Sequence, residues 1–170
     1  MGAVAALVVL GFAGTAQADK GSGKDGAQVI QLQDRCDPAT FDAALHDPNA
    51  CVRDGGTTFA DFFAEFLKNG SVGHWRFHPD DVQIRAGQSL TAVNVGGEFH
   101  TFTRVDQFGP GCVDALNQGQ APPAFCADPA VFPGTGVPPG GSRPVTGLAP
   151  GTYKFQCLIH PWMHTVVTVR

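Results

Sequence analysis

The sequence predicts a mainly β fold: an antiparallel β-sandwich that carries a small helical extension near its N-terminus. Three observations predict it. The chain holds 22 glycines and 13 prolines among 170 residues, a composition typical of short strands joined by turns and not of a helical bundle. Short alternating apolar runs separated by turn residues recur after residue 72, whereas two segments between residues 37 and 70 have helical spacing.

The N-terminal residues 1–18 have the features of a secretory signal peptide. Residues 3–13 are apolar and uncharged, and residues 16–18 form an A-x-A cleavage site followed by polar residues. The apolar run is too short for a typical membrane span, which favours cleavage over an uncleaved membrane anchor or a buried core segment. We therefore expect a periplasmic or secreted protein, anchored to the membrane if the segment is not cleaved. Residues 19–27, rich in glycine and charged residues, predict a flexible linker.

Five cysteines are consistent with export, and their odd number leaves one thiol unpaired. Cys36 and Cys51 bracket one loop-like stretch, and Cys112 and Cys126 bracket another. Four cysteines allow three pairings, and among these we prefer the two local disulfides, each of which would stabilise the fold by about 3 kcal/mol in the chain-entropy model. Cys157 is then the free thiol.

Residues 28–70 predict the helical extension. Asp37 is an N-cap residue that is followed by proline at the first helical position. Thr58 begins a second helix, in which Asp61 completes a capping box. Apolar side chains then recur at helical spacing and predict a packing face formed by Phe59, Phe62, Phe63, Phe66 and Leu67.

Residues 71–170 predict the sandwich domain. Strands are expected at residues 74–79, 81–85, 89–95, 99–105, 152–157 and 164–170, with a turn at residues 86–88. Residues 107–143, rich in proline and glycine, predict a loop insertion between the fourth and fifth of these strands. A loop of this length in a compact domain is either functional or held by its own disulfide.

The stretch FQCLIHPWMH, residues 155–164, concentrates side chains that bind soft metals. Cys157, His160 and Met163 follow a C-x2-H-x2-M spacing in the turn between the last two expected strands. A thiolate, an imidazole and a thioether form a soft set that suits copper, and a tight turn can direct them toward one point. A second histidine must come from elsewhere, and His100 is best placed because it follows a Gly-Gly turn. Two histidines, a cysteine and a weak axial methionine form a mononuclear blue-copper electron-transfer site.

Each of these residues also has an ordinary interpretation. Cys157 would otherwise be a buried structural thiol, His100 a strand residue, and Met163 a core methionine with another group in the axial position. The other histidines have no evident partner and are interpreted as bystanders: His46, His74, His78 and His164.

The two segments that carry the candidate ligands resemble the cupredoxin, or blue copper, family. GTYKFQCLIHPWMHTVVTV is similar to the C-terminal end of cupredoxins, and its ligand loop is most similar to those of amicyanins and plastocyanins. VQIRAGQSLTAVNVGGEFHTF resembles the preceding half, where Asn94 lies six residues before His100. The resemblance spans about residues 75–170 without the insertion. It implies a Greek-key β-sandwich, one-electron transfer, and one type 1 copper ion bound by His100, Cys157, His160 and Met163.

The resemblance also implies how electrons and partners reach the site. His160 should lie near the surface with its ring edge as the entry for electrons, and Pro161 and Trp162 should form an apolar patch on which redox partner proteins dock. A net charge of -4 without Lys or Arg clusters argues against a nucleic-acid partner. No small-molecule substrate is evident.

The sequence motifs of copper enzymes and metalloproteases do not occur in this chain. It has no His-x-His pair, no H-E-x-x-H motif and only one cysteine in the ligand loop, so we expect no enzyme. A periplasmic copper carrier or chaperone, which delivers the metal without passing electrons, would use the same soft ligands. A third function consistent with the sequence is an interaction domain with a vestigial site, in which the helices and the insertion hold the function.

Overall fold

The computed structural model describes residues 26–170. The predicted signal peptide, residues 1–18, and most of the predicted linker, residues 19–27, lie outside the described residues. Within residues 26–170, none of the helices combines the length and the apolar character needed to cross a membrane.

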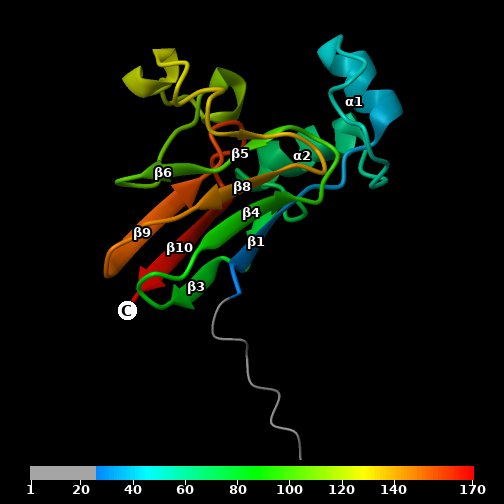
Figure 1. The fold of residues 1–170 in the computed structure, drawn as a ribbon. Helices are drawn as coiled ribbons and strands as arrows, with labels where there is room; N and C mark the ends of the chain where they lie inside the picture. Colours follow the sequence, from blue (N-terminus) through cyan, green and yellow to red (C-terminus); the bar gives the residue numbers. More distant parts are fainter. Residues whose placement is uncertain (1–25) are drawn as a thin grey trace, which may run out of the picture.

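Two four-stranded sheets form the body of the molecule (Figure 1). The first sheet contains, in spatial order, β2 (Arg76–His78), β1 (Gln28–Gln33), β4 (Leu90–Asn94) and β8 (Ser142–Val145). The second contains β3 (Asp81–Ile84), β10 (His164–Val169), β9 (Gly151–Gln156) and β6 (Thr103–Val105). A separate two-stranded ladder pairs β5 (His100–Thr101) with β7 (Gly136–Val137). The predicted mainly β fold is confirmed.

Both sheets are mixed, which corrects the expectation of a wholly antiparallel sandwich. β1 runs parallel to β4, and β3 runs parallel to β10, while the other pairs are antiparallel. Each parallel pair joins strands that are far apart in the sequence. Parallel partners need long crossover connections, so an interpretation based on neighbouring runs and turns does not detect them.

Residues 28–70 begin with a strand, so the predicted helical extension is wrong in its first part. β1 lies between β2 and β4 in the first sheet, with Ile30 and Leu32 fully buried. Its sequence QVIQLQ alternates apolar and polar residues with the period of a strand. The helices follow only after this strand: α1 (Pro38–Leu45) and α2 (Phe59–Asn69).

The two helices begin where their capping residues predict. The Asp37 side chain accepts a hydrogen bond from the Thr40 N–H at 2.9 Å, and the Thr58 hydroxyl accepts one from the Asp61 N–H at 3.1 Å. Each bond satisfies an N–H group that has no partner within its own helix. α2 buries Phe62 and Phe66 and packs Phe59 and Phe63 against the core, which confirms the phenylalanine stripe as a packing face. Leu67 was predicted to belong to this face, but it is 74% exposed because it lies beyond the edge of the buried stripe.

The insertion, residues 107–143, is mostly irregular and contains two short 3-10 helices, η1 (Asp114–Leu116) and η2 (Ala124–Ala127). Its C-terminal part differs from the predicted loop, because β7 and the start of β8 lie within it. Its glycine and proline residues conceal these short strands, which form through pairing with β5 and β4. Both preferred disulfides are present: Cys36–Cys51 and Cys112–Cys126.

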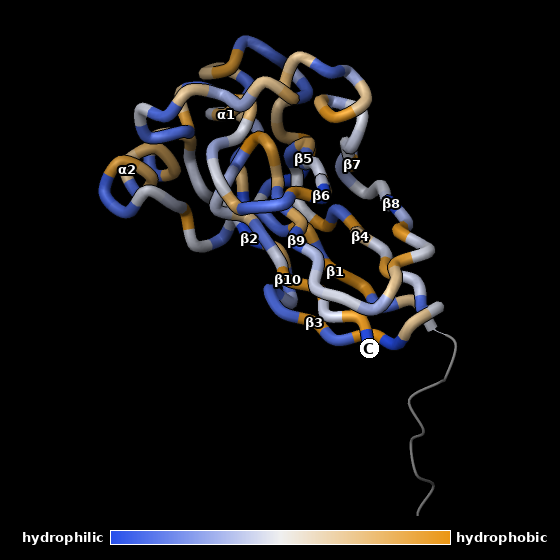
Figure 2. Tube along the Cα trace, turned by 90° about the vertical axis from the view of Figure 1, so that its left-hand side faces the viewer, coloured by the Kyte–Doolittle hydropathy of each residue, from blue (hydrophilic) through white to orange (hydrophobic). Residues whose placement is uncertain are grey.

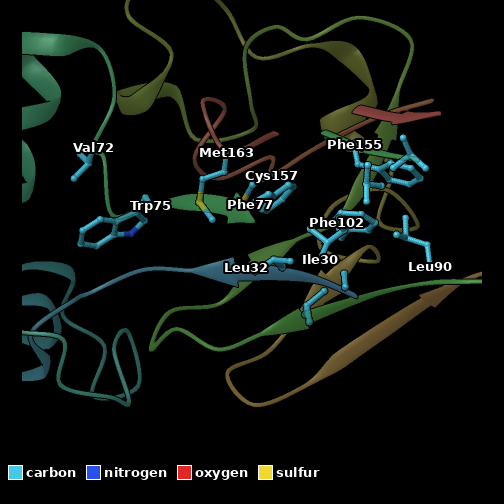
Figure 3. Packing of buried hydrophobic residues seen from close by; sticks show 14 of the residues in the cluster. Ile30, Leu32, Val72, Trp75, Phe77, Leu90, Phe102, Phe155, Cys157 and Met163 are labelled. Atoms are coloured by element: carbon cyan, nitrogen blue, oxygen red, sulfur yellow. The ribbon is translucent and has the colours of Figure 1, made fainter. Parts of the chain in front are cut away.

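The core lies between the two sheets. Hydrophobic stretches run along β1 and β4 (Figure 2), and the rings of Phe102 and Phe155 stack with their centroids 4.4 Å apart. The buried residues extend from Leu90 at one end to Trp75, Cys157 and Met163 at the other (Figure 3). α1, α2 and the insertion gather at one end of the sandwich, opposite the end where the C-terminus lies (Figure 1).

Candidate metal centre

Three of the four predicted ligands converge at the end of the core. His100, Cys157 and His160 each offer one ligand atom, and these atoms all lie within 4.8 Å of one another. His100 opens β5, Cys157 directly follows β9, and His160 lies in the loop before β10. The Nδ1 atom of His100 is 3.9 Å from the Cys157 sulfur although 57 residues separate the two in sequence.

Met163 lies beside this cluster. The loop from Cys157 to Met163 is closed by its own backbone: the Cys157 N–H donates to the Met163 carbonyl, and the Met163 N–H donates to the His160 carbonyl, both at 2.9 Å. β9 and β10 pair directly on either side of this turn. Met163 is fully buried, and Figure 3 shows it next to Cys157. Its role as axial ligand stays a prediction.

Hydrogen bonds from β5 and its turn hold His100 against the ligand loop. The Thr101 N–H points at the Cys157 sulfur at 3.5 Å, and the Thr101 hydroxyl accepts from the Leu158 N–H at 2.8 Å. The Asn94 side chain donates to the carbonyls of Glu98 and Val137, at 2.7 and 2.9 Å. Asn94 therefore fixes the turn that leads into His100.

The insertion braces the ligand loop from the other side. Gln156 and Gly109 exchange two hydrogen bonds, of 3.0 and 2.8 Å, between the glutamine side chain and the glycine backbone. The Cys112 N–H donates to the Leu158 carbonyl at 2.5 Å. Because Cys112 is bonded to Cys126, the disulfide that pins the insertion also restrains the turn that carries Cys157.

Two buried carboxylates face the ring nitrogens of the two histidines. His100 Nε2 lies 2.9 Å from an Asp34 oxygen, with both side chains fully buried. His160 Nε2 lies 3.8 Å from a Glu98 oxygen, which also accepts a hydrogen bond from the indole N–H of Trp75. Each carboxylate faces an Nε2 atom, so the Nδ1 atom of each histidine remains available to bind a metal ion.

The donor atoms fit a bound metal ion. His160 Nδ1 is buried and has no hydrogen-bond partner within residues 26–170. A buried imidazole nitrogen without a partner is costly unless another group satisfies it. Together with His100 Nδ1 and the Cys157 sulfur, it forms a soft donor set suited to copper.

Sequence reasoning missed both carboxylates. Glu98 lies two residues before His100, which is a weak signal, since an acidic residue in a turn is usually a solvated one. Asp34 lies 66 residues before His100, and no feature of its neighbours indicates a role. Only the placement of β1 beside β4 carries Asp34 to the histidine.

The charges of the cluster shift the pKa of its members. Burial alone lowers the pKa of His100, but hydrogen bonds to Asp34 and Cys157 and their negative charges outweigh it and raise the pKa to about 10. Burial alone raises the pKa of Cys157, but His100 and His160 outweigh it and hold the thiol pKa well below its usual value. Burial also dominates at Glu98 and raises its pKa. At Asp34 burial is again the largest single effect, but the hydrogen bond and charge of His100, together with the backbone hydrogen bonds from Gly97 and Glu98, outweigh it and lower the pKa.

Copper uptake by the metal-free protein should therefore release the proton of His100. With a pKa of about 10, His100 is protonated at neutral pH, while the lowered pKa of Cys157 favours its thiolate form. A metal displaces the proton, so the apparent affinity should rise roughly tenfold per pH unit up to the pKa of His100. Titration calorimetry in two buffers of different ionisation enthalpy measures the proton count. An affinity that does not change with pH would contradict this protonation state.

His160 is buried, which corrects the expectation of an exposed ring edge. It is 2% exposed. Its ring lies against those of Phe62, Trp75 and Trp162, with centroids 6.0, 6.5 and 5.5 Å away. Phe62 belongs to α2, outside the segments that resemble cupredoxins, so the resemblance gave no sign that a helix covers this histidine. The bystander histidines, in contrast, are all exposed: His46, His74, His78 and His164.

No protein-family model matches this chain, and no curated protein matches it significantly. Similar solved structures include a purple cupredoxin from Nitrosopumilus maritimus, with 20% identity, a TM-score of 0.39, and coverage of 58% of this chain and 86% of that chain. Oxidised plastocyanin from Dryopteris crassirhizoma is 25% identical, with a TM-score of 0.39 and coverage of 59% of this chain and 93% of the plastocyanin. An oxidised amicyanin mutant is 14% identical, with a TM-score of 0.42 and coverage of 86% of this chain and 84% of the amicyanin. These three structures are cupredoxins, the family that the two ligand-bearing segments resemble. Their TM-scores are below 0.5, so the function of this chain has to be inferred from its own donor atoms.

Proposed function

We propose that this chain is an exported mononuclear copper protein that transfers single electrons. The copper ion would be held by His100, Cys157, His160 and Met163. The observation that carries the proposal is the convergence of three buried donor atoms within 4.8 Å, at which a thiolate and two imidazoles meet. Two disulfides support export, because disulfides persist in oxidising compartments.

The protein around the site restricts movement of the ligands. Bound copper supplies a one-electron redox couple. The chain's own contribution is rigidity: Thr101 bonds to the ligand loop, Gln156 anchors it to the insertion, and Asp34 holds His100. Ligands that cannot rearrange between two oxidation states lower the barrier to electron transfer, so this bracing favours a carrier of electrons.

Burial of the site argues against two other functions. Asp34, His100 and Cys157 are arranged like a carboxylate, base and nucleophile, but the cysteine is 0% exposed, so no substrate reaches its sulfur. A copper chaperone delivers metal by exchanging ligands with an acceptor, and here the three clustered ligands are at most 2% exposed. Electrons, unlike ligands or substrates, can cross a few ångströms of packed protein.

The burial of His160 moves the proposed entry point for electrons from the ring edge of His160 to Trp162. The Trp162 ring is half-buried, lies 5.5 Å from that of His160 between centroids, and lines a surface pocket with Pro161, His164 and Pro110. We propose that redox partner proteins dock near His160 and Trp162 at this pocket, with the indole connecting the surface to the buried histidine.

Copper loading and voltammetry test the proposal. The mature chain is purified with its disulfides intact and the Cys157 thiol reduced, and is then loaded with Cu(II). It should show intense blue absorption and a reversible one-electron wave in voltammetry. A colourless protein that binds Cu(I) and releases it to a chelating acceptor would support the carrier instead. Failure to bind copper while the Cys157 thiol is intact would refute both.

His164→Ala should leave the blue absorption and the reduction potential unchanged. His164 is exposed and stacks on Phe108 with centroids 4.3 Å apart, outside the cluster of donor atoms. Absorption spectroscopy of the copper-loaded variant checks this. Loss of the blue band would place His164 among the ligands and would refute the assignment of Met163 and His160.

A further inference from the structure

Asp34 is built into the site as firmly as the ligands themselves. Its carboxylate accepts four hydrogen bonds: one oxygen from the N–H groups of Cys36 and Gly97, at 3.3 and 2.9 Å, and the other from the Glu98 N–H and His100 Nε2, at 3.1 and 2.9 Å. The side chain is fully buried. A buried carboxylate with four donors is fixed in orientation and in charge.

The surrounding backbone is shaped to admit this carboxylate. Asp34 directly follows β1, and the Cys36–Cys51 disulfide anchors the chain two residues later. On the other side, a Cβ atom at Gly96 would collide with the Asp34 carboxylate. The Gly-Gly turn before His100 therefore has a specific purpose: it lets the carboxylate approach the backbone that presents the histidine.

We propose that Asp34 is a positioning residue of the copper site, one that directs His100 Nδ1 to the metal and favours Cu(II) over Cu(I). The proposal rests on the copper site proposed above. The carboxylate accepts a hydrogen bond from Nε2 and so keeps the proton of the metal-bound imidazole on that nitrogen. Nδ1, which lies 3.9 Å from the Cys157 sulfur, is then the nitrogen that binds the metal once its own proton is displaced. The buried negative charge attracts a divalent ion more strongly than a monovalent one, because little solvent screens it.

Asp34→Asn separates this role from simple structural support. Asparagine keeps the shape and one acceptor oxygen but removes the charge. We expect the ratio of Cu(II) to Cu(I) affinity to fall about tenfold, which for a one-electron couple equals a rise in reduction potential of about 59 mV. A merely structural role would weaken the binding of both ions by the same factor and leave the potential unchanged.

Asp54→Asn is the matched control. Asp54 is exposed, and the one hydrogen bond that it accepts within residues 26–170 is a local one from the Gly56 N–H, so the same change of charge should leave the potential at its wild-type value. If Asp34→Asn shifts the potential no more than Asp54→Asn does, the inference is wrong. A wild-type chain that takes up no copper would instead refute the proposed function, so the two failures are distinguishable.

A measurement on the wild type covers the case in which Asp34→Asn does not fold. The Cu(I)-loaded protein is diamagnetic, so proton–nitrogen NMR can locate the imidazole protons. His100 should be protonated at Nε2 only, and this proton should exchange with water far more slowly than those of the exposed His74. A proton on His100 Nδ1, or Nε2 exchange as fast as in His74, would overturn the inference.

Discussion

Cys157→Ala should abolish the blue absorption of the copper-loaded protein and weaken Cu(II) binding by more than about 100-fold. Losses up to about 100-fold are typical of residues that only support a ligand, so the loss of a ligand itself should exceed this value. The thiolate is the only sulfur anion of the proposed ligand set, and its charge transfer to Cu(II) is the source of the colour. The other four cysteines form the two disulfides, so no other described thiol can replace Cys157. Absorption spectroscopy and competition with a Cu(II) chelator measure the two effects.

The fold should tolerate this substitution, so that the loss can be assigned to the metal. Replacing a buried cysteine with alanine removes one sulfur atom and leaves a small cavity, which costs on the order of 1 kcal/mol. Circular dichroism of the variant should therefore match that of the wild type. A folded Cys157→Ala protein that retains the blue band would show that the ligand assignment is wrong.

Phe62→Ala should lower the free energy of unfolding by about 3–5 kcal/mol, the range for a fully buried phenylalanine. Phe62 is 3% exposed and occupies the centre of the aromatic cluster over the site. Its ring lies within 6.4 Å, between centroids, of those of Phe41, Phe59, Phe63, Trp75, Trp162 and His160. Denaturant unfolding of the metal-free protein measures the change.

Leu67→Ala is the matched control for this variant. Leu67 lies on the same helix but is 74% exposed, so its truncation should change stability by less than about 0.5 kcal/mol. If Phe62→Ala is no more destabilising than Leu67→Ala, α2 does not cover His160 as described. A destabilised but folded Phe62→Ala protein should also exchange electrons faster with small soluble reagents, since the ring that shields His160 is gone.

The parts of this molecule that local sequence determines were the predictable ones. Asp37 and Thr58 mark the starts of α1 and α2, because a capping side chain bonds to backbone only three residues away. Cys157, His160 and Met163 share one tight turn, so their spacing alone indicates that they gather. His100 was placed by its position after a Gly-Gly turn, a signal that is also local.

The parts that depend on distant contacts were not predictable. Nothing near Asp34 indicates that β1 will lie beside β4 and bring its carboxylate to His100. The stripe on α2 predicted a packing face, but not that Phe62 would cover His160. Periodicity shows that a face is buried, and it does not show which distant group it meets.

The central claim is that one copper ion sits between His100, Cys157 and His160 and keeps these ligands in both oxidation states. X-ray absorption spectroscopy of the oxidised and the reduced copper-loaded protein tests it most directly. Both spectra should show one short thiolate sulfur and two imidazole nitrogens, with little change in metal–ligand distances on reduction. A copper ion without a sulfur ligand, or one that loses an imidazole on reduction, would contradict the account.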